Sequence, residues 1–442
     1  MNLEFTITIL LNKYNLNKYL QEIKFNNLIY GLLENVIKLM IEYIEDSVLQ
    51  LIHNDIYYDV WDYAYNIVYI QYIENKLIEN LYELSEELSI NLLYKCTTIA
   101  NILVFKYFIP KRSYTKTYIR KNHNNESYNL VINNVKISNQ VNLLKSIKQP
   151  DQRTDEWYLF RNSTLTASNI YKIFISEYSQ NQLIIEKCEP IDINKFKTTN
   201  LSSPMHWGQK YEPVSILYYD YINDTKVDEF GCIPHSDYSF IAASPDGIIC
   251  DASSELFGRM LEIKNVVSRV ITGVPKMEYW IQMQVQMEVC NLNECDFLET
   301  KFIEYTDLEE YLEDEDDSKY KGTFLQFLKA GEPVYIYPPF LLNDINSNEY
   351  NTWFQKQLIV NKELELIKTI YWKLEVISCV LVMRNKFWFA NVLPQIETFW
   401  NTLIKERQDG SYKNRYSKKR KLKMEDEKSK SDFPNPGCLI HL

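Results

Sequence analysis

The chain has 442 residues, of which 46% are hydrophobic and 24% are charged, and it carries a net charge of −11. A chain of this length can bury a large core and is expected to form two or three structural units. The negative net charge argues against a general binder of polyanions, but it does not exclude contacts to nucleic acid through local basic patches. The eight Cys are scattered, and the sequence contains neither a typical signal peptide nor an apolar run of about 18 residues. We therefore expect an intracellular protein with reduced thiols and no membrane span.

Residues 1–108 are predicted to form a helical region. They contain no Pro and only Gly31, and the run LIYGLLENVIKLMIEYIEDSVLQLI places apolar residues at helical spacing. Residues 109–150 are predicted to form a polar, basic linker, whose cations include Lys111, Arg112, Lys116, Arg120 and Lys121. The alternative is a contact to the DNA backbone, since Lys and Arg interleaved with Tyr suit phosphates and stacked bases.

Beyond residue 345 the sequence predicts a helical extension and a tail. Residues 346–408, with the run WFQKQLIVNKELELIKTIYWKLEVI, are expected to be helical. The acidic run DLEEYLEDEDDSKYKG before them predicts an exposed helix end or loop. Residues 409–442 are charged and poor in large apolar residues, which predicts disorder. Their KKRKLK run is typical of a nuclear import signal, a nucleic-acid tether or a plain solubilising tail.

Two stretches within residues 151–345, where we expect a folded core, place charged side chains together. GRMLEIKNVV predicts a strand on which Glu262 and Lys264 share one face, because side chains alternate along a strand. YSFIAASPDGII predicts a short strand that turns at Asp246 and Gly247. If the two strands pair, Asp246 lies beside Glu262, although the connection between them is longer than a tight hairpin requires.

Two carboxylates without a nearby His favour a hard cation such as Mg²⁺ or Mn²⁺. Two such ions about 4 Å apart can activate water and polarise a phosphoryl oxygen, so the pattern fits cleavage of a phosphodiester. Lys264 would then orient or deprotonate the attacking water, with its pKa lowered by neighbouring cations. The pattern Asp…Glu-x-Lys is weak by itself, since accidental surface charge on short strands often includes Glu and Lys.

Three further segments strengthen the pattern. HWGQKYEPVSILYYD predicts a helix whose Glu212 could join the acidic cluster, unless it is a plain exposed Glu. YWIQMQVQMEVC predicts a helix on which Gln282 could bond the reacting water or phosphate, unless its polar stripe faces solvent. TDEWYLFRNSTLTASNIYKIF predicts a helix that begins at Thr154. Arg161 in this helix, and Ser168 as the cap of the helix that follows, could hold a terminal phosphate.

Taken in order, these motifs resemble the YqaJ viral recombinase family, which is related to phage lambda exonuclease and lies in the PD-(D/E)xK nuclease superfamily. The resemblance rests on W…R…TAS, WG…YE, SPDG, LEIK and Y-x-x-Q-x-Q-x-x-M, and covers roughly residues 150–300. It implies an α/β core with a central mixed sheet flanked by helices. It also implies a Mg²⁺-dependent exonuclease that degrades one strand of linear duplex DNA in the 5′ to 3′ direction.

The resemblance further implies roles for individual residues. Metal ligands would be Asp246, Glu262 and the backbone carbonyl of Ile263, holding two ions of Mg²⁺ or of Mn²⁺ in its place. The rest of the catalytic set would be Glu212, Lys264 and Gln282, and the 5′-phosphate would be held by Arg161 and Ser168.

The implied partners are double-stranded DNA ends, and a single-strand annealing recombinase and a homo-oligomer are compatible with the resemblance. Relatives with long added terminal regions occur in large DNA viruses, which would place the protein in the host cytoplasm or nucleus and give it a role in viral recombination, repair or genome processing. Two alternatives stay open: an endonuclease of the same superfamily, and a DNA-binding scaffold whose nuclease core has lapsed.

Overall fold

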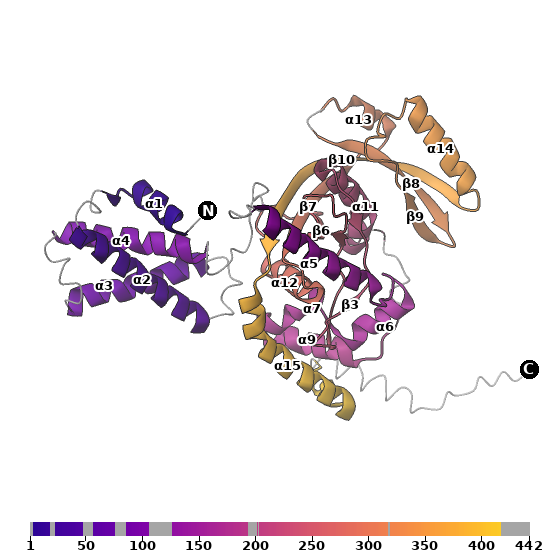
Figure 1. Ribbon diagram of the computed structural model, residues 1–442. Helices are drawn as coiled ribbons and strands as arrows, with labels where there is room; N and C mark the ends of the chain where they lie inside the picture. The colour runs from indigo at the N-terminus through magenta and orange to yellow at the C-terminus, as the bar shows by residue number, and fades with distance from the viewer. Residues whose placement is uncertain are drawn as a thin grey trace, which may run out of the picture.

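The structure is a computed structural model, which describes residues 3–17, 23–46, 56–75, 85–105, 126–192, 201, 203–316 and 319–416 (Figure 1). The basic run at residues 111–121 and the KKRKLK run lie outside these ranges, as does the part of the predicted disordered tail (residues 409–442) from residue 417 onward. The prediction of disorder is wrong for the start of this tail, since Ser411–Arg415 form a 3₁₀ turn, Arg415 forms an ion pair with Glu406, and Tyr416 is buried. None of the helices in the described ranges is long and apolar enough to cross a membrane.

The described residues of the N-terminal part form a bundle of four helices: α1 (Leu3–Lys13), α2 (Ile23–Asp46), α3 (Ile56–Asn75) and α4 (Glu86–Leu103). Its core contains Val36, Met40, Ala64 and Leu93, all of which are fully buried. Val36 and Met40 lie four residues apart on one face of α2, so the helix that the apolar pattern predicted there is present. Ser85 begins α4, since its hydroxyl accepts a hydrogen bond from the backbone N–H of Leu88 at 3.4 Å.

The remaining helices within the described ranges surround two sheets. They are α5 (Glu126–Ser146), α6 (Asp155–Ser163), α7 (Ala167–Ile170), α8 (Lys172–Ile175), α9 (Glu177–Cys188), α11 (Pro204–Asn223), α12 (Met277–Cys290), α13 (Leu308–Glu313), α14 (Asn348–Val360), α15 (Lys386–Asp409) and the 3₁₀ turn η5 (Ser411–Arg415). The strands are β1 (Leu165–Thr166), β2 (Val227–Asp228), β3 (Ile233–Pro234), β4 (Ile241–Ala243), β5 (Gly247–Ile249), β6 (Met260–Asn265), β7 (Glu294–Glu304), β8 (Lys321–Lys329), β9 (Glu332–Ile336) and β10 (Glu365–Met383).

The larger sheet has the strand order β2-β5-β6-β7-β10-β8-β9, and the smaller has the order β1-β4-β3. In the larger sheet β6 and β7 run parallel while the other neighbours are antiparallel, so the sheet is mixed. Helix α11 covers one face, where Tyr211 packs against Phe302, and α12 covers the other, where Tyr279 packs against Phe297. This arrangement confirms the predicted α/β core with a central mixed sheet flanked by helices.

The C-terminal extension differs from the helical prediction for residues 346–408. Helices α14 and α15 are present, but the apolar run between them forms the long strand β10, which pairs with β7 on one side and with β8 on the other. Its sequence ELIKTIYWKLEVISCVLVM is rich in β-branched and aromatic residues, which suit a strand that is covered by neighbours on both sides. The sheet of the core therefore extends past residue 345, and the acidic run before β8 contains the short helix α13.

The segment predicted as a linker is also partly helical, since α5 occupies residues 126–146. Val141 and Leu144 on this helix are buried, and the side chain of Gln140 donates a hydrogen bond to the carbonyl of Cys290 at 2.8 Å. Lys145 forms an ion pair with Asp228 of β2 at 2.6 Å. Helix α5 is thus attached to the α/β part, and the prediction of a solvated linker is wrong for these residues.

Helix α15 is expected to contribute strongly to stability through Trp388, which is fully buried and packs edge-to-face on Trp280 of α12 with ring centroids 5.1 Å apart. Trp388→Ala should lower the free energy of unfolding by about 3–5 kcal/mol, because it removes a large buried ring and leaves a cavity. Denaturant unfolding followed by circular dichroism would measure the loss. The matched control Trp353→Ala on α14, where the ring is only half-buried, should cost much less. Equal losses would contradict the expected contribution.

Candidate active site

The pairing of β5 with β6 brings two acidic residues together. Gly247 lies opposite Leu261 in the antiparallel register, so Asp246 just before β5 lies beside Glu262 on β6. A side chain at position 247 would force Val227 on β2 to shift, since an added Cβ would lie 1.9 Å from Cγ1 of Val227. The carboxylate of Asp246 also accepts a hydrogen bond from the backbone N–H of Ile263 at 2.7 Å. This hydrogen bond fixes the turn before β5 to strand β6.

Glu262 is fully buried, and both of its carboxylate oxygens have donors. Oε1 accepts hydrogen bonds from Gln282 Nε2 at 2.8 Å and from Lys264 Nζ, and Oε2 accepts one from Gln286 Nε2 at 2.7 Å. Both glutamines come from α12, on the face that covers β6. A buried carboxylate is stable only when it is paired and hydrogen-bonded, and these donors supply that compensation.

Lys264 shares the face of β6 with Glu262, as the alternation of the strand predicted. Its ammonium lies 5.1 Å from the ring centroid of Tyr279. Burial acts to lower the pKa of Lys264, but the carboxylates of Glu262 and Asp246 outweigh it and raise the pKa above its ordinary value. The predicted lowering of this pKa refers to metal cations bound beside Lys264, and it stays a prediction.

Glu212 of α11 lies at the end of the site that holds Asp246, Glu262 and Lys264. Its Oε2 is 3.0 Å from Nη2 of Arg153, and the Glu212 side chain is 24% exposed. Burial raises the pKa of Glu212, Arg153 lowers it, and the carboxylate of Glu262 raises it. Burial likewise raises the pKa of Asp246 well above its usual range, together with the charges of Glu262 and Glu212. The carboxylates of Glu212, Asp246 and Glu262 therefore repel one another, as the members of an acidic cluster do.

The donor chemistry of this cluster fits a hard divalent cation. Within the described ranges, no three Asp, Glu, His or Cys side chains come close enough together to hold a metal ion by themselves. Mg²⁺, however, is usually held by one or two carboxylates, with water and substrate phosphates completing its shell. Asp246 and Glu262 supply two such carboxylates whose mutual repulsion a cation would relieve. Binding of the metal by these residues and by the carbonyl of Ile263 stays a prediction.

Arg161 and Ser168 also meet, as predicted. The guanidinium Nη2 donates to Ser168 Oγ at 2.9 Å and lies over the ring of Trp157, with 4.3 Å from Cζ to the centroid. Burial lowers the pKa of Arg161. The predicted role of Ser168 as a helix cap is wrong, because Thr166 is the residue that caps α7. The backbone N–H of Thr166 donates a hydrogen bond to Asn169 Oδ1 at 2.9 Å, and Ser168 lies within the first turn of the helix. Its hydroxyl is 3.2 Å from that of Thr166.

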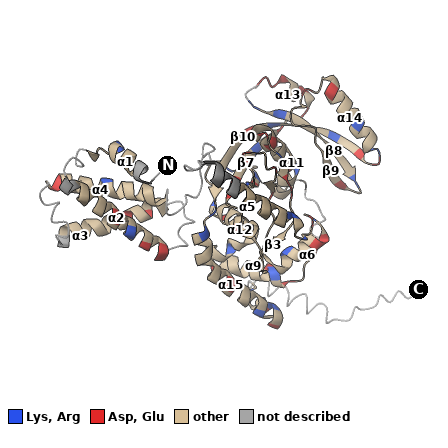
Figure 2. Ribbon diagram, in the orientation of Figure 1, with Lys and Arg blue, Asp and Glu red and all other residues tan. Residues whose placement is uncertain are grey.

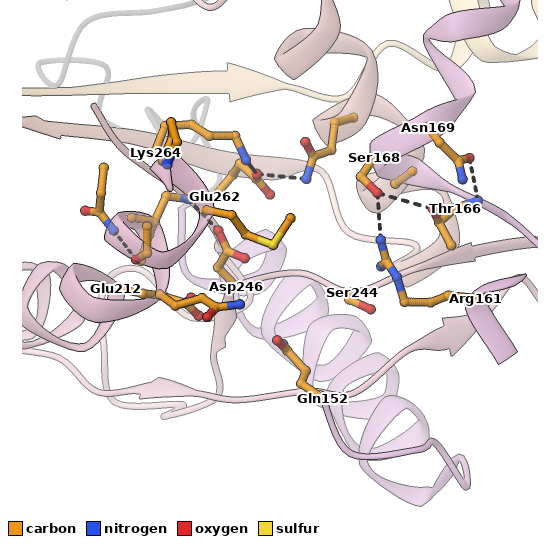
Figure 3. Close-up of a pocket in the computed structure, with 18 of the residues that line it drawn as sticks. Gln152, Arg161, Thr166, Ser168, Asn169, Glu212, Ser244, Asp246, Glu262 and Lys264 are labelled. Carbon is orange, nitrogen blue, oxygen red and sulfur yellow. Dashed lines mark hydrogen bonds and ion pairs between the residues drawn. The ribbon is translucent and has the colours of Figure 1, made fainter. Parts of the chain in front are cut away.

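These two groups line one cleft with a volume of 1060 Å³. Figure 3 shows Glu212, Asp246, Glu262 and Lys264 on one side, Arg161 and Ser168 on the other, and Ser244 between them. The cleft therefore brings together every side chain that the sequence proposed for the site: Arg161, Ser168, Glu212, Asp246, Glu262, Lys264 and Gln282.

Two residues at the site were not assigned a role from sequence. Gln286 follows Gln282 by four residues and so lies on the same stripe of the helix, and a fully buried Gln on an apolar helix requires a partner, which here is Glu262. Arg153 had no such signal, since its contact with Glu212 depends on a turn before α6 that the sequence does not predict.

Gln286 is expected to matter more for stability than Gln282, although both donate to the same carboxylate. Gln286→Met leaves Oε2 of Glu262 without its donor in a buried position, which should cost about 1–3 kcal/mol. Gln282→Met, of the same size, leaves Oε1 still bonded to Lys264 and should cost less. Urea unfolding of both variants would measure the difference. A larger loss for Gln282→Met would contradict this account of Glu262.

Comparison with known proteins identifies relatives of this chain. Residues 156–293 match the family described as the YqaJ-like viral recombinase domain. The uncharacterized protein R354 of Acanthamoeba polyphaga mimivirus is 28% identical over 356 residues, which are 70% of this chain and 60% of that protein. The chain thus spans 60% of the length of this relative. The alkaline exonuclease LHK-Exo from Laribacter hongkongensis, alone and in complex with dAMP, is 19% identical, with 59% of this chain and 98% of that chain covered and a TM-score of 0.35.

Proposed function

We propose that this chain, whose residues 156–293 form a YqaJ-like viral recombinase domain as the sequence motifs predicted, is a metal-dependent exonuclease that hydrolyses linear duplex DNA from 5′ to 3′. The observation that carries the proposal is the meeting of two kinds of group in one cleft. A carboxylate cluster with a lysine suits cleavage of a phosphodiester, and a buried guanidinium with a hydroxyl suits a terminal phosphate. A viral relative agrees with a role in viral DNA recombination, repair or genome processing.

The cation is proposed to be held by Asp246 and Glu262, with the Ile263 carbonyl as a further ligand. When bound, Mg²⁺ or Mn²⁺ would act as a Lewis acid on the scissile phosphate. Lys264, which is bonded to Glu262, would orient or deprotonate the attacking water. Gln282 would help to fix the position of Glu262 and would lie within reach of the same water.

The other end of the cleft is proposed to bind the 5′-phosphate. In the described part of the chain, the guanidinium of Arg161 contacts the Ser168 hydroxyl and the Trp157 ring rather than a carboxylate. A buried cation without a paired anion favours an anionic ligand, and a guanidinium can bind phosphate through two hydrogen bonds. Binding of the terminal phosphate at this end would place the first phosphodiester toward the carboxylates.

DNA would be attracted to this cleft by local groups rather than by the protein as a whole. The net charge is −11, and Figure 2 shows acidic and basic residues interspersed along the helices and strands. A protein with this charge repels a polyanion at long range, so binding depends on the cations at the cleft and on the cation that the carboxylates hold. Double-stranded DNA ends are the proposed substrate, and an annealing recombinase is a proposed partner.

Asp246→Asn should abolish most nuclease activity and weaken binding of Mn²⁺. The change replaces a charged ligand of the carboxylate cluster by a neutral amide oxygen, and a metal ion contributes several kcal/mol to catalysis, so the rate should fall at least about 100-fold. A time course on linear duplex DNA labelled at either end would measure the rate, and calorimetry would measure Mn²⁺ uptake. The matched control Asp251→Asn changes an exposed acid in the loop after β5 and should leave both unchanged. Unaltered Mn²⁺ uptake in Asp246→Asn would favour a lapsed scaffold.

Arg161→Ala should reduce activity on 5′-phosphorylated ends by about 10- to 100-fold, the value of a charged hydrogen bond lost from the transition state. Ends without a 5′-phosphate should be much less affected, because the guanidinium then has no phosphate to bind. Parallel digests of duplexes with and without the phosphate would test this, with thermal unfolding to verify the fold. An equal loss on circular DNA would instead indicate an endonuclease.

A further inference from the structure

Arg153 lies on the wall of the cleft and is bonded to the carboxylate of Glu212. The side chain of Arg153 is 48% exposed and that of Glu212 is 24% exposed, and Nη2 lies 3.0 Å from Oε2. Both residues line the cleft that also contains Asp246 and Glu262. The pair therefore stands at the solvent edge of the site, where a ligand that enters the cleft can reach the guanidinium.

The backbone holds Arg153 in an unusual conformation. Its φ is 67°, in the left-handed region that a long L side chain rarely adopts. The residues around it are tied down, since the hydroxyl of Thr154 donates to the carbonyl of Asp151 at 2.7 Å, and Gln152 donates to the carbonyl of Phe230 at 3.0 Å. Such strain persists only where the surroundings fix it, and it concentrates at functional sites. The turn thus presents the guanidinium to Glu212 in a defined position.

The ion pair has a consequence for the cation site. One oxygen of Glu212 is taken up by Arg153, and within the described ranges no three potential ligand side chains come together. Glu212 nevertheless lines the same cleft as Asp246 and Glu262, and Figure 3 shows it on their side of the cleft. Glu212 is therefore near the acidic cluster while it is engaged elsewhere.

We propose that Arg153 is a positioning residue that holds Glu212 away from the cation until a DNA phosphate takes the guanidinium. This inference rests on the proposed function. A phosphate is a suitable competing partner, because a guanidinium forms paired hydrogen bonds to phosphate as well as to carboxylate. Once DNA occupies the cleft, Glu212 is free to turn toward the cation. DNA and the cation then tighten each other's binding by the same factor, as linkage requires.

Calorimetric titration of the full chain with Ca²⁺ tests the coupling. Titrations would be made without DNA and with a 5′-phosphorylated duplex whose terminal linkages are phosphorothioates, which resist cleavage. For the parent chain, the duplex should tighten Ca²⁺ binding both through its own phosphates and by releasing Glu212. Arg153→Ala should bind Ca²⁺ about two- to fivefold more tightly than the parent without DNA, and the gain in Ca²⁺ affinity from the duplex should be smaller than in the parent by the same factor, the value of a solvent-exposed ion pair.

Matched variants separate this role from a general effect of charge. Arg153→Gly removes the same side chain while relieving the left-handed backbone, so it should behave as Arg153→Ala does even if Ala destabilises the turn. Lys145→Ala removes one cation with the same 48% exposure from its ion pair with Asp228, and it should leave Ca²⁺ affinity unchanged. In a Glu212→Gln background, Arg153→Gly should no longer change Ca²⁺ affinity.

The outcomes distinguish the two proposals. If the parent binds Ca²⁺ and neither Arg153 variant binds it more tightly without DNA, the positioning role is overturned while the proposed function stands. An equal gain in the Glu212→Gln background would overturn it as well, since the effect would not pass through Glu212. If the parent binds no Ca²⁺ with or without DNA, the cation site itself fails, and both proposals fall together.

Discussion

The buried carboxylate of Glu262 is the constraint on which the site depends. A charged side chain that is 0% exposed must be compensated locally, and its partners come from two elements: Lys264 from the same strand, and Gln282 and Gln286 from α12. The helix that covers the sheet is therefore also the helix that fixes the acidic group. The stability of the core and the geometry of the site are therefore linked through Glu262. A substitution that disturbs the packing of α12 also disturbs the position of this carboxylate.

Much of this site follows from local sequence. Alternation along β6 places Glu262 and Lys264 on the face toward α12, and Leu261 and Ile263 on the face toward α11, because the period of a strand does not depend on distant contacts. Helical spacing similarly predicts that Gln282 and Gln286 share one stripe of α12. Arg161 and Ser168 meet because only a short strand separates their two helices.

Other features depend on tertiary contacts and could not be read from the sequence. The run that forms β10 has apolar residues at spacings that suit either a helix or a strand, and its state is decided by pairing with β7 and β8. Helix α5 has little amphipathic character, so no periodic pattern in its sequence predicts that Gln140 and Lys145 attach it to the α/β part. The capping of α7 by Thr166 rather than Ser168 depends on a break after α6 that no Gly or Pro marks. Few turn-forming residues make such breaks hard to place.

The path of β10 affects which part of the chain can exist as an independent unit. Residues 156–293 match a family by themselves, yet β6 takes its parallel partner from β7, and β7 in turn pairs with β10, which runs from Glu365 to Met383. A fragment limited to the matched residues would leave β6 as an unpaired hydrophobic edge, and such edges promote aggregation. Homology and cooperative folding therefore have different boundaries in this protein, and the residues beyond the match are needed to complete the sheet that carries Glu262.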